Sequence, residues 1–376
     1  MKAPLIHFRK AKIEDISNLA HFFSVVYGPK HICTNQKYLA WFFQNPLQVK
    51  KDDELSAFLA EIKKGKIVGY AGCYPASIVI KDKHYKTAWL ANFVTKKDFR
   101  GIGIGSKILT KIVEKYDLGL AASFSTQAYP LYRKLGWRHV TYYERFIKIL
   151  NRKSAQDIMR TLYPNEDVTL PSQKLDKKML SKNKTVAQAR ISWIKELDVE
   201  TSKCWNKDWL NIRKRYGATT DRTTTYLSWR FFSHPFVRYK IALVYAPDKS
   251  IAGMLMMRIE QVSIFTIGRI VDIVAKEGYD HLLINAVLLF AKGEKLDALD
   301  CYTTFAPLKR SLKACDFVSA KKSPYCYLPE LFNPLAVKSQ DPIKLKILIH
   351  SKEAIVLPPS KSWHLVKADG DRDRAY

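Results

Sequence analysis

Apolar and polar residues follow one another along the chain in patterns that predict strands interleaved with helices. Residues 88–95 and 268–276 are apolar, strand-like runs. Between residues 106 and 115, in the sequence SKILTKIVEK, the apolar positions recur at helical spacing instead. Near the C-terminus, KLKILIH at 344–350 predicts a further strand and LPPSKSW at 357–363 a Pro-bounded turn. The pattern therefore predicts a fold that mixes strands and helices throughout.

Glycines at alternate positions separate the strand-like run at 88–95 from the helical run that follows. Gly101, Gly103 and Gly105 can adopt positive φ and let the backbone approach an anion closely. Free N–H groups and the positive end of the helix dipole would then face a bound diphosphate. The guanidinium of Arg100 would add charged hydrogen-bond donors beside it. The predicted phosphate-binding loop, which we call the glycine loop, comprises Arg100, Gly101, Ile102, Gly103, Ile104, Gly105 and Ser106.

Two common nucleotide-binding motifs do not fit this loop. A dinucleotide fingerprint needs glycine at position 106, where the chain has Ser106, and an acidic residue about 20 residues further on. A P-loop needs Gly-Lys followed by Ser or Thr, which the loop lacks.

Three ordered motifs resemble the GNAT acetyltransferase superfamily. Its acetyl-CoA loop reads Arg or Gln, two residues, Gly, one residue, then Gly or Ala, and Arg100, Gly103 and Gly105 fill this pattern. KIVGYAGCYP at 66–75 is similar to the middle strand of that family, and LYRKLGW at 131–137 to its late helix-to-strand motif. The resemblance implies an α/β fold of the α+β type, a mixed, mostly antiparallel sheet flanked by helices, and acetyl-CoA as co-substrate.

The resemblance also implies roles for individual residues. Asn92, Phe93 and Val94 would offer backbone groups to the pantetheine arm and the thioester, and Tyr132 would protonate the departing thiolate. Ser125 stands where the family often has an asparagine that contacts CoA. A different role for Tyr132, filling the core beside its aromatic and leucine neighbours, stays open.

The second half of the chain repeats the order of the first, which predicts a tandem duplication. The YLxW element at 38–41 returns at 226–229, and later matches follow at steadily shorter offsets. At those offsets Arg100 corresponds to Asp280 and Tyr132 to Lys309, so we expect the second copy to bind no CoA.

These comparisons predict four parts. They are a GNAT acetyltransferase domain at 1–150, a basic connection at 151–189, a degenerate GNAT-like domain at 190–335 that shapes the acceptor site, and a C-terminal extension at 336–376.

The acceptor site and the general base are less well defined. Trp41, Arg230 and Asp272 are candidates for acceptor contacts. Asp272, a carboxylate within an apolar strand, could also be the missing base, or it could form an ion pair within the fold. We leave the base unassigned.

The net charge of +28 suggests an anionic acceptor. The first choice is the amine of an amino sugar that is linked to a nucleotide or to a lipid carrier. The duplicated layout and the DGDRDR sequence at 369–374 resemble those of acetyltransferases in surface-polysaccharide synthesis. A protein amine or an RNA base is an alternative acceptor. A second hypothesis, a nucleic-acid-binding protein with a vestigial GNAT fold, is opposed by the intact RGIGIG sequence.

Cysteine and histidine spacing and the hydropathy pattern complete the expectations. The six cysteines include no CxxC pair and the nine histidines no HExxH motif, so we expect neither a metal site nor a disulfide framework. No apolar run is long enough to span a bilayer, and the N-terminus lacks a signal-peptide core, so we expect a cytoplasmic protein that can contact an anionic membrane surface.

Overall fold

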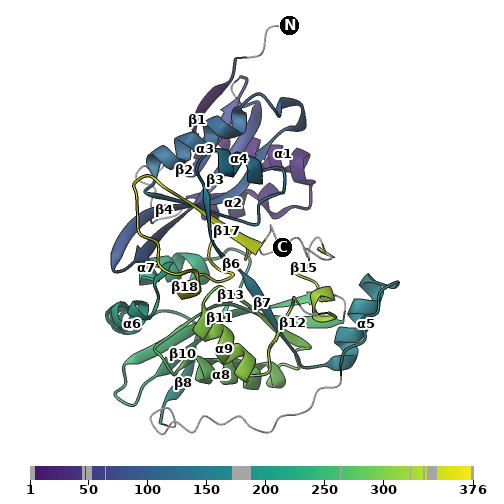
Figure 1. The fold of residues 1–376 in the computed structure, drawn as a ribbon, viewed down its shortest axis with the longest axis vertical. Helices are drawn as coiled ribbons and strands as arrows, with labels where there is room; N and C mark the ends of the chain where they lie inside the picture. The colour runs from purple at the N-terminus through teal and green to yellow at the C-terminus, as the bar shows by residue number, and fades with distance from the viewer. Residues whose placement is uncertain are drawn as a thin grey trace.

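The computed structural model of the chain contains two mixed sheets, one above the other, each flanked by helices (Figure 1). We call each sheet with its helices a module, the first module being the one that holds the N-terminus. The predicted fold class is confirmed. The structure describes residues 5–44, 47, 53–63, 65–171, 188–262, 264–321, 323–332, 335–336 and 345–373.

The sheet of the first module has the strand order β1-β2-β3-β4-β5-β17-β6, and β9 and β18 extend it beside β3. Among the neighbours in that order, only β4 and β5 run parallel. The strands are β1 (His7–Lys12), β2 (Glu54–Glu61), β3 (Ile67–Ile80), β4 (Lys83–Thr95), β5 (Leu118–Ala122), β6 (Arg138–Tyr142), β9 (Ala218–Thr220), β17 (Lys346–Ser351) and β18 (Trp363–His364).

The sheet of the second module has the order β8-β10-β11-β12-β13-β7-β14, again with one parallel pair, β12 and β13. A separate short hairpin joins β15 (Leu331–Phe332) to β16 (Leu335–Ala336). The strands of the second sheet are β7 (Glu144–Ile149), β8 (Arg190–Ile194), β10 (Lys240–Tyr245), β11 (Ile251–Val262), β12 (Phe265–Ala275), β13 (Ala298–Thr303) and β14 (Val318–Ser319).

Each sheet contains strands from the other half of the chain, and β9 and β18 of the second half have already been placed in the first sheet. β7 follows β6 directly in sequence but lies between β13 and β14 of the second sheet. β17, from the C-terminal extension, returns to lie between β5 and β6 of the first sheet. Within the run at 344–350, residues 346–350 thus form a strand as predicted. The domain boundaries stay a prediction, and the structure adds that neither sheet is built from one half of the sequence alone.

Helices cover both faces of the first sheet. Apolar residues of α3 pack with one face, and those of α1 and α2 pack with the other. In the second module α8 lies against the central strands, and α5 packs through its buried Ile158 and Met159 on the far end of β12. The helices are α1 (Ile16–Tyr27), α2 (Gln36–Phe43), α3 (Ile104–Lys115), α4 (Tyr129–Lys134), α5 (Arg152–Leu162), α6 (Val199–Ile212), α7 (Thr224–Leu227), α8 (Asp280–Gly293) and α9 (Ala306–Ala314).

The C-terminal segment from Trp363 to Asp373, which we call the tail, is buried between the modules. Trp363, Leu365 and Asp369 have no exposed surface. Figure 1 shows the yellow end of the chain at the level where the two sheets meet. Residues 172–187, within the basic connection predicted at 151–189, lie outside the described residues.

Within the described ranges, no helix is long and apolar enough to cross a membrane. The same residues contain no group of His, Cys, Asp and Glu side chains that could hold a metal ion.

Candidate active site

Strands β4 and β5 pair over only a short distance and then separate. Their parallel register joins Thr87, Ala88 and Trp89 to the start of β5. From Leu90 to Thr95, β4 continues with β3 as its one partner among the described strands. The other edge of this segment therefore carries backbone donors and acceptors that no described strand uses.

A bulge lies within this open segment. Tyr70 pairs with Val94 and Gly72 with Ala91, so that two residues of β4, Asn92 and Phe93, face one residue of β3. Asn92 has φ 53°, a left-handed conformation that asparagine tolerates better than most residues. The bulge thus interrupts the regular ladder at Asn92 and Phe93, two of the three positions predicted to contact the thioester.

Asn92 is only 9% exposed. Its Nδ2 donates to Cys33 Sγ at 3.2 Å, and its Oδ1 is buried without a hydrogen-bond partner among the described residues. A buried carbonyl oxygen without a donor is costly, which favours a donor supplied by water or a ligand at this point.

The glycine loop leads from the end of β4 into α3. Gly101 and Gly103 have φ of 83° and 86°, and a Cβ at either would meet no atom within 4 Å. Backbone conformation therefore requires these two glycines, and the space beside them is open. Gly105 is different, because its Cβ would lie 3.0 Å from Phe93 Cζ and 3.1 Å from Leu131 Cδ2. Glycine there lets the first turn of α3 pack against β4 and α4.

The N-terminus of α3 fits a phosphate group. Gly103 caps the helix without a side-chain hydrogen bond, so the first-turn N–H groups are not used by a capping side chain. Arg100 is exposed, and its Nε donates to the carbonyl of Thr95 at 3.2 Å, which holds the guanidinium beside the open end of β4. Ile102 is 54% exposed at the tip of the loop, while Ile104 is buried and Ser106 half-buried.

Tyr132 lies on α4, on the same face of the sheet as the glycine loop. Its ring contacts those of Phe93, Phe124 and Trp137, with centroids 6.0, 5.3 and 5.1 Å away, and it is 2% exposed. Burial, with a smaller effect of Asp371, raises the pKa of Tyr132 far above its ordinary value, so the phenol stays protonated. The structure thus gives Tyr132 both a packing role and the protonation state of an acid.

Ser125 lies in the turn before α4, where its Oγ accepts a hydrogen bond from the Ala128 N–H at 3.2 Å. The side chain is exposed and stabilises this turn.

In the second module, the corresponding edge is covered by the chain itself. Beyond its pairing with β13, β12 receives the tail: the Ala368 N–H donates to the carbonyl of Val271, and His364 Nε2 lies 2.9 Å from the carbonyl of Ile273. On the other side Val366 bridges to Thr303. The tail therefore lies between β12 and β13 where these strands separate. Beyond Trp89, by contrast, no described strand lies between β4 and β5.

The start of α8 is also closed to a phosphate. Asp280 is 4% exposed and receives two hydrogen bonds from Arg215, at 2.9 and 2.6 Å. Lys309, at the position corresponding to Tyr132, pairs with Glu144 at 3.1 Å. These contacts support the expectation that the second module binds no CoA.

The proposed acceptor contacts are largely enclosed. Asp272 has no exposed surface and pairs with Arg222 at 2.8 Å, which is the ion pair expected as the alternative to catalysis. Burial raises the pKa of Asp272 to about 6. Arg230 is 1% exposed and bonds Asp373 and Tyr239. Trp41 is half-buried and stacks on Trp229.

One element near the site was not predicted from the sequence, namely the tail. A Cβ on Gly370 would lie 3.1 Å from the ring of Trp89, the last residue of β4 that pairs with β5. Arg372 donates to Ser123 Oγ at 2.7 Å, just beyond the end of β5. The only sequence signal was the alternation of acids and arginines in DGDRDR, which does not reveal its partners.

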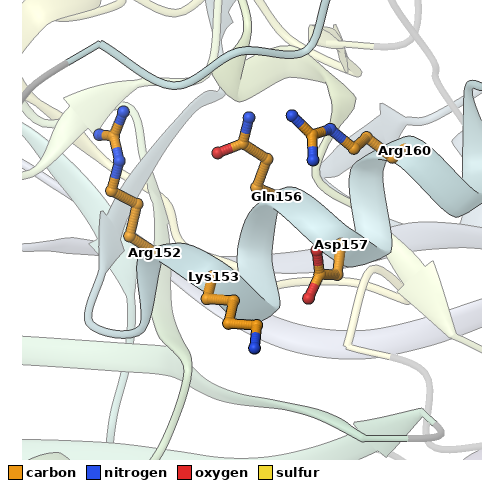
Figure 2. A pocket seen from close by; sticks show the side chains of 5 residues that line it. All are labelled: Arg152, Lys153, Gln156, Asp157 and Arg160. Atoms are coloured by element: carbon orange, nitrogen blue, oxygen red, sulfur yellow. The ribbon is translucent and has the colours of Figure 1, made fainter.

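A hollow of about 450 Å³ lies elsewhere, along the exposed side of α5. Figure 2 shows Arg152, Gln156 and Arg160 projecting to one side of the helix, as their spacing of four residues requires, with Lys153 and Asp157 on the other. Arg152 also bonds the carbonyls of Leu170 and Pro171. This surface is basic and far in sequence from the glycine loop.

The separation of β4 from β5, the bulge at Asn92 and the glycine loop at α3 together form a candidate site for an acyl-CoA. Residues 53–139, which span all three features and Tyr132, match the family model of the acetyltransferase (GNAT) domain. Residues 53–139 are therefore an acetyltransferase (GNAT) domain, which uses an acyl-CoA as co-substrate, as predicted. No curated protein sequence matches the chain.

Solved structures share the fold across both modules. A probable N-acyltransferase of Enterococcus faecalis V583 has a TM-score of 0.56 at 12% identity, over 92% of this chain and 73% of its own. A GCN5-related N-acetyltransferase of Anabaena variabilis has a TM-score of 0.53 at 12% identity, over 92% and 72%. Saccharomyces cerevisiae N-myristoyltransferase with bound myristoyl-CoA has a TM-score of 0.52 at 13% identity, over 93% and 84%. At 12–13% sequence identity, these similarities show a shared fold only.

Proposed function

We propose that the protein transfers an acetyl group from acetyl-CoA to an amine, in the first module only. The observation that carries this proposal is the contrast between the two sheets. The edge of β4 beyond Trp89 faces no described strand and leads into a glycine loop, whereas the corresponding edge of β12 is bonded by the tail.

In this proposal the glycine loop and the N-terminus of α3 bind the diphosphate of CoA, with Arg100 alongside. Phe93 and Val94 offer backbone groups to the pantetheine arm. Asn92, at the bulge, lies where a tetrahedral oxyanion would form, and donors at such a point lower the barrier because they bind the charge that develops. Tyr132 protonates the departing thiolate.

We further propose an anionic acceptor, with an amino sugar on a nucleotide or lipid carrier in surface-polysaccharide synthesis as the first choice. The net charge of +28 supports an anionic partner, since it attracts anions over a distance. The basic side of α5 is a place where a phosphorylated carrier or an anionic membrane surface would be held. The reaction would then take place in the cytoplasm.

A peptide amine is the second candidate acceptor. The fold likeness to N-myristoyltransferase extends over both modules, and that enzyme is bound to a longer acyl-CoA in the solved structure. Acyl-chain length therefore belongs among the variables tested.

The test is acetyl transfer followed through release of the CoA thiol, with nucleotide-linked amino sugars and peptides as acceptors and acetyl-CoA or myristoyl-CoA as donor. We expect turnover with acetyl-CoA and an amino sugar, and a product heavier by one acetyl group. Turnover with peptides alone would favour the second candidate. Salt-sensitive binding to nucleic acid without any acyl-CoA turnover would contradict the proposal.

A further inference from the structure

Asn92 and Phe93, the two residues at the bulge of β4, point to opposite faces of the first sheet. Phe93 lies on the face of the glycine loop, where its ring contacts that of Tyr132. Asn92 points to the other face, because its Nδ2 donates to Cys33 Sγ at 3.2 Å. Cys33 lies in η2 (Ile32–Thr34), the short helix between α1 and α2. The Asn92 side chain and Tyr132 therefore lie on opposite sides of the open edge of β4.

Burial decreases along β4 from the bulge outward. Ala91 is buried, Asn92 keeps 9% of its surface exposed, and Phe93 and Val94 are half-buried. Between Leu90 and Thr95, Asn92 is thus the innermost polar side chain. A ligand group that enters along the open edge meets its amide at the inner end.

The amide of Asn92 offers a hydrogen-bond acceptor at this point. Its Nδ2 is engaged with Cys33, while its Oδ1 is buried without a hydrogen-bond partner among the described residues. An amide oxygen accepts and cannot donate, so its partner must carry an N–H or O–H group. The thioester group has neither, whereas an acceptor amine has N–H donors. The unpartnered oxygen therefore fits the acceptor amine better than it fits the thioester.

Two neighbouring elements border this end of the site on the α1–α2 face. A Cβ on Gly72, beside the bulge on β3, would lie 2.3 Å from Phe43 Cε1, so α2 packs directly on the sheet there. In the tail, a Cβ on Gly370 would lie 3.1 Å from the ring of Trp89. Both contacts are with apolar rings. Asn92 thus supplies a polar atom between apolar neighbours, which is how a site selects a polar group of its ligand.

We propose that the acceptor amine binds on the α1–α2 face of β4 by donating a hydrogen bond to Asn92 Oδ1, and that Cys33 is the positioning residue that orients this oxygen. The inference rests on the proposed function, because it places the amine of the same acetyl transfer. The amine would reach the thioester from one face of the sheet, while Tyr132 protonates the departing thiolate from the other. Backbone N–H groups at the bulge remain for the oxyanion.

Asn92→Asp and Asn92→Gly distinguish an amine contact from an oxyanion contact. Both new residues tolerate the left-handed φ of 53°, and aspartate keeps an acceptor oxygen in the place of Oδ1. For an amine contact, Asn92→Asp should keep kcat/KM for the amine within about threefold of wild type, and Asn92→Gly should lose about 10-fold. For an oxyanion contact, the carboxylate would repel the developing charge, and Asn92→Asp would be slower than Asn92→Gly.

The positioning role of Cys33 has a matched control in Cys73. Both thiols are buried in the first module, Cys33 on the α1–α2 face and Cys73 on the face of α3. Cys33→Ala and Cys73→Ala should lower Tm by similar amounts and leave the affinity for acetyl-CoA unchanged in calorimetric titration. Only Cys33→Ala should lower kcat/KM for the amine, by about fivefold. Cys33→Ser should recover most of that loss, because its hydroxyl can accept from Asn92 Nδ2.

The outcomes separate the two proposals. An active wild type in which Asn92→Asp is slower than Asn92→Gly, or in which the two alanine variants have the same kcat/KM, overturns this inference and leaves acetyl transfer intact. Should Asn92→Asp fail to fold, the cysteine variants decide alone. A wild type that acetylates no amine overturns the proposed function and this inference together.

Discussion

Trp41 and Trp229 donate hydrogen bonds to each other's backbone. The indole Nε1 of Trp41 donates to the carbonyl of Trp229 at 3.1 Å, and Nε1 of Trp229 donates to the carbonyl of Trp41 at 3.0 Å. Their rings stack, with centroids 5.4 Å apart and planes inclined by 24°. Each residue ends a YLxW element, so these two elements contact each other through the same pair of atoms in both directions.

This reciprocal contact predicts coupled stability. Trp41→Phe and Trp229→Phe each remove one buried N–H donor, and each should cost about 1 kcal/mol in the free energy of unfolding. Because the two bonds share one stacked geometry, the double variant should depart from additivity by at least about 0.5 kcal/mol. Denaturant titration of the four proteins measures this, and strict additivity would contradict the coupling.

Replacement of Tyr132 by Phe tests its role as an acid. The ring packing with Phe124 and Trp137 is preserved, so we expect the same Tm and the same affinity for acetyl-CoA. Loss of the phenol proton should lower kcat about 100-fold. An unchanged kcat would assign Tyr132 to the core alone.

The bulge at Asn92 separates the role of the backbone from that of the side chain. Asn92→Gly keeps the left-handed conformation and should fold, with its loss of kcat reporting the contribution of the amide. Asn92→Val forces a β-branched residue into φ 53° and should destabilise the fold by about 1–3 kcal/mol. A Val variant as stable as the Gly variant would contradict the strained bulge.

Acid stability depends in part on Glu330, a carboxylate that pairs with Arg372 of the tail. Burial by itself would raise the pKa of Glu330, but Arg372, Lys367 and Arg145 outweigh it and lower the pKa to about 2. A depressed carboxylate pKa contributes stability above the unfolded value near 4.5 that is lost as pH falls toward 2, at most about 3 kcal/mol for this group.

Glu330→Gln should therefore be destabilised at pH 7 and approach the wild type near pH 2, as measured by urea unfolding at several pH values. Glu353→Gln, at an exposed glutamate, is the matched control and should follow the wild type throughout. Parallel curves for Glu330→Gln and wild type would exclude this linkage.

Local features of the first module could be predicted from the sequence, because they follow from short-range rules. The glycine loop is a contiguous pattern whose φ values and helix start are fixed locally, and the strand at 344–350 is visible as an apolar run. Its place between β5 and β6 is not visible, since that pairing joins residues more than 200 positions apart.

The partners of buried charged side chains could not be predicted from the sequence either. Asp272 and Arg230 were candidates for acceptor contacts because the sequence does not identify Arg222 and Asp373 as their partners, although an ion pair was the alternative for Asp272.

The central claim is that one module binds acetyl-CoA and the other does not. Gly103 and Gly278 offer a matched pair, with φ of 86° and 88°, open surroundings, and positions just before α3 and α8. Calorimetric titration of acetyl-CoA into wild type, Gly103→Glu and Gly278→Glu tests the claim directly. We expect about one equivalent bound by wild type and by Gly278→Glu, and none by Gly103→Glu. Two equivalents in wild type, or binding lost in Gly278→Glu and kept in Gly103→Glu, would contradict it.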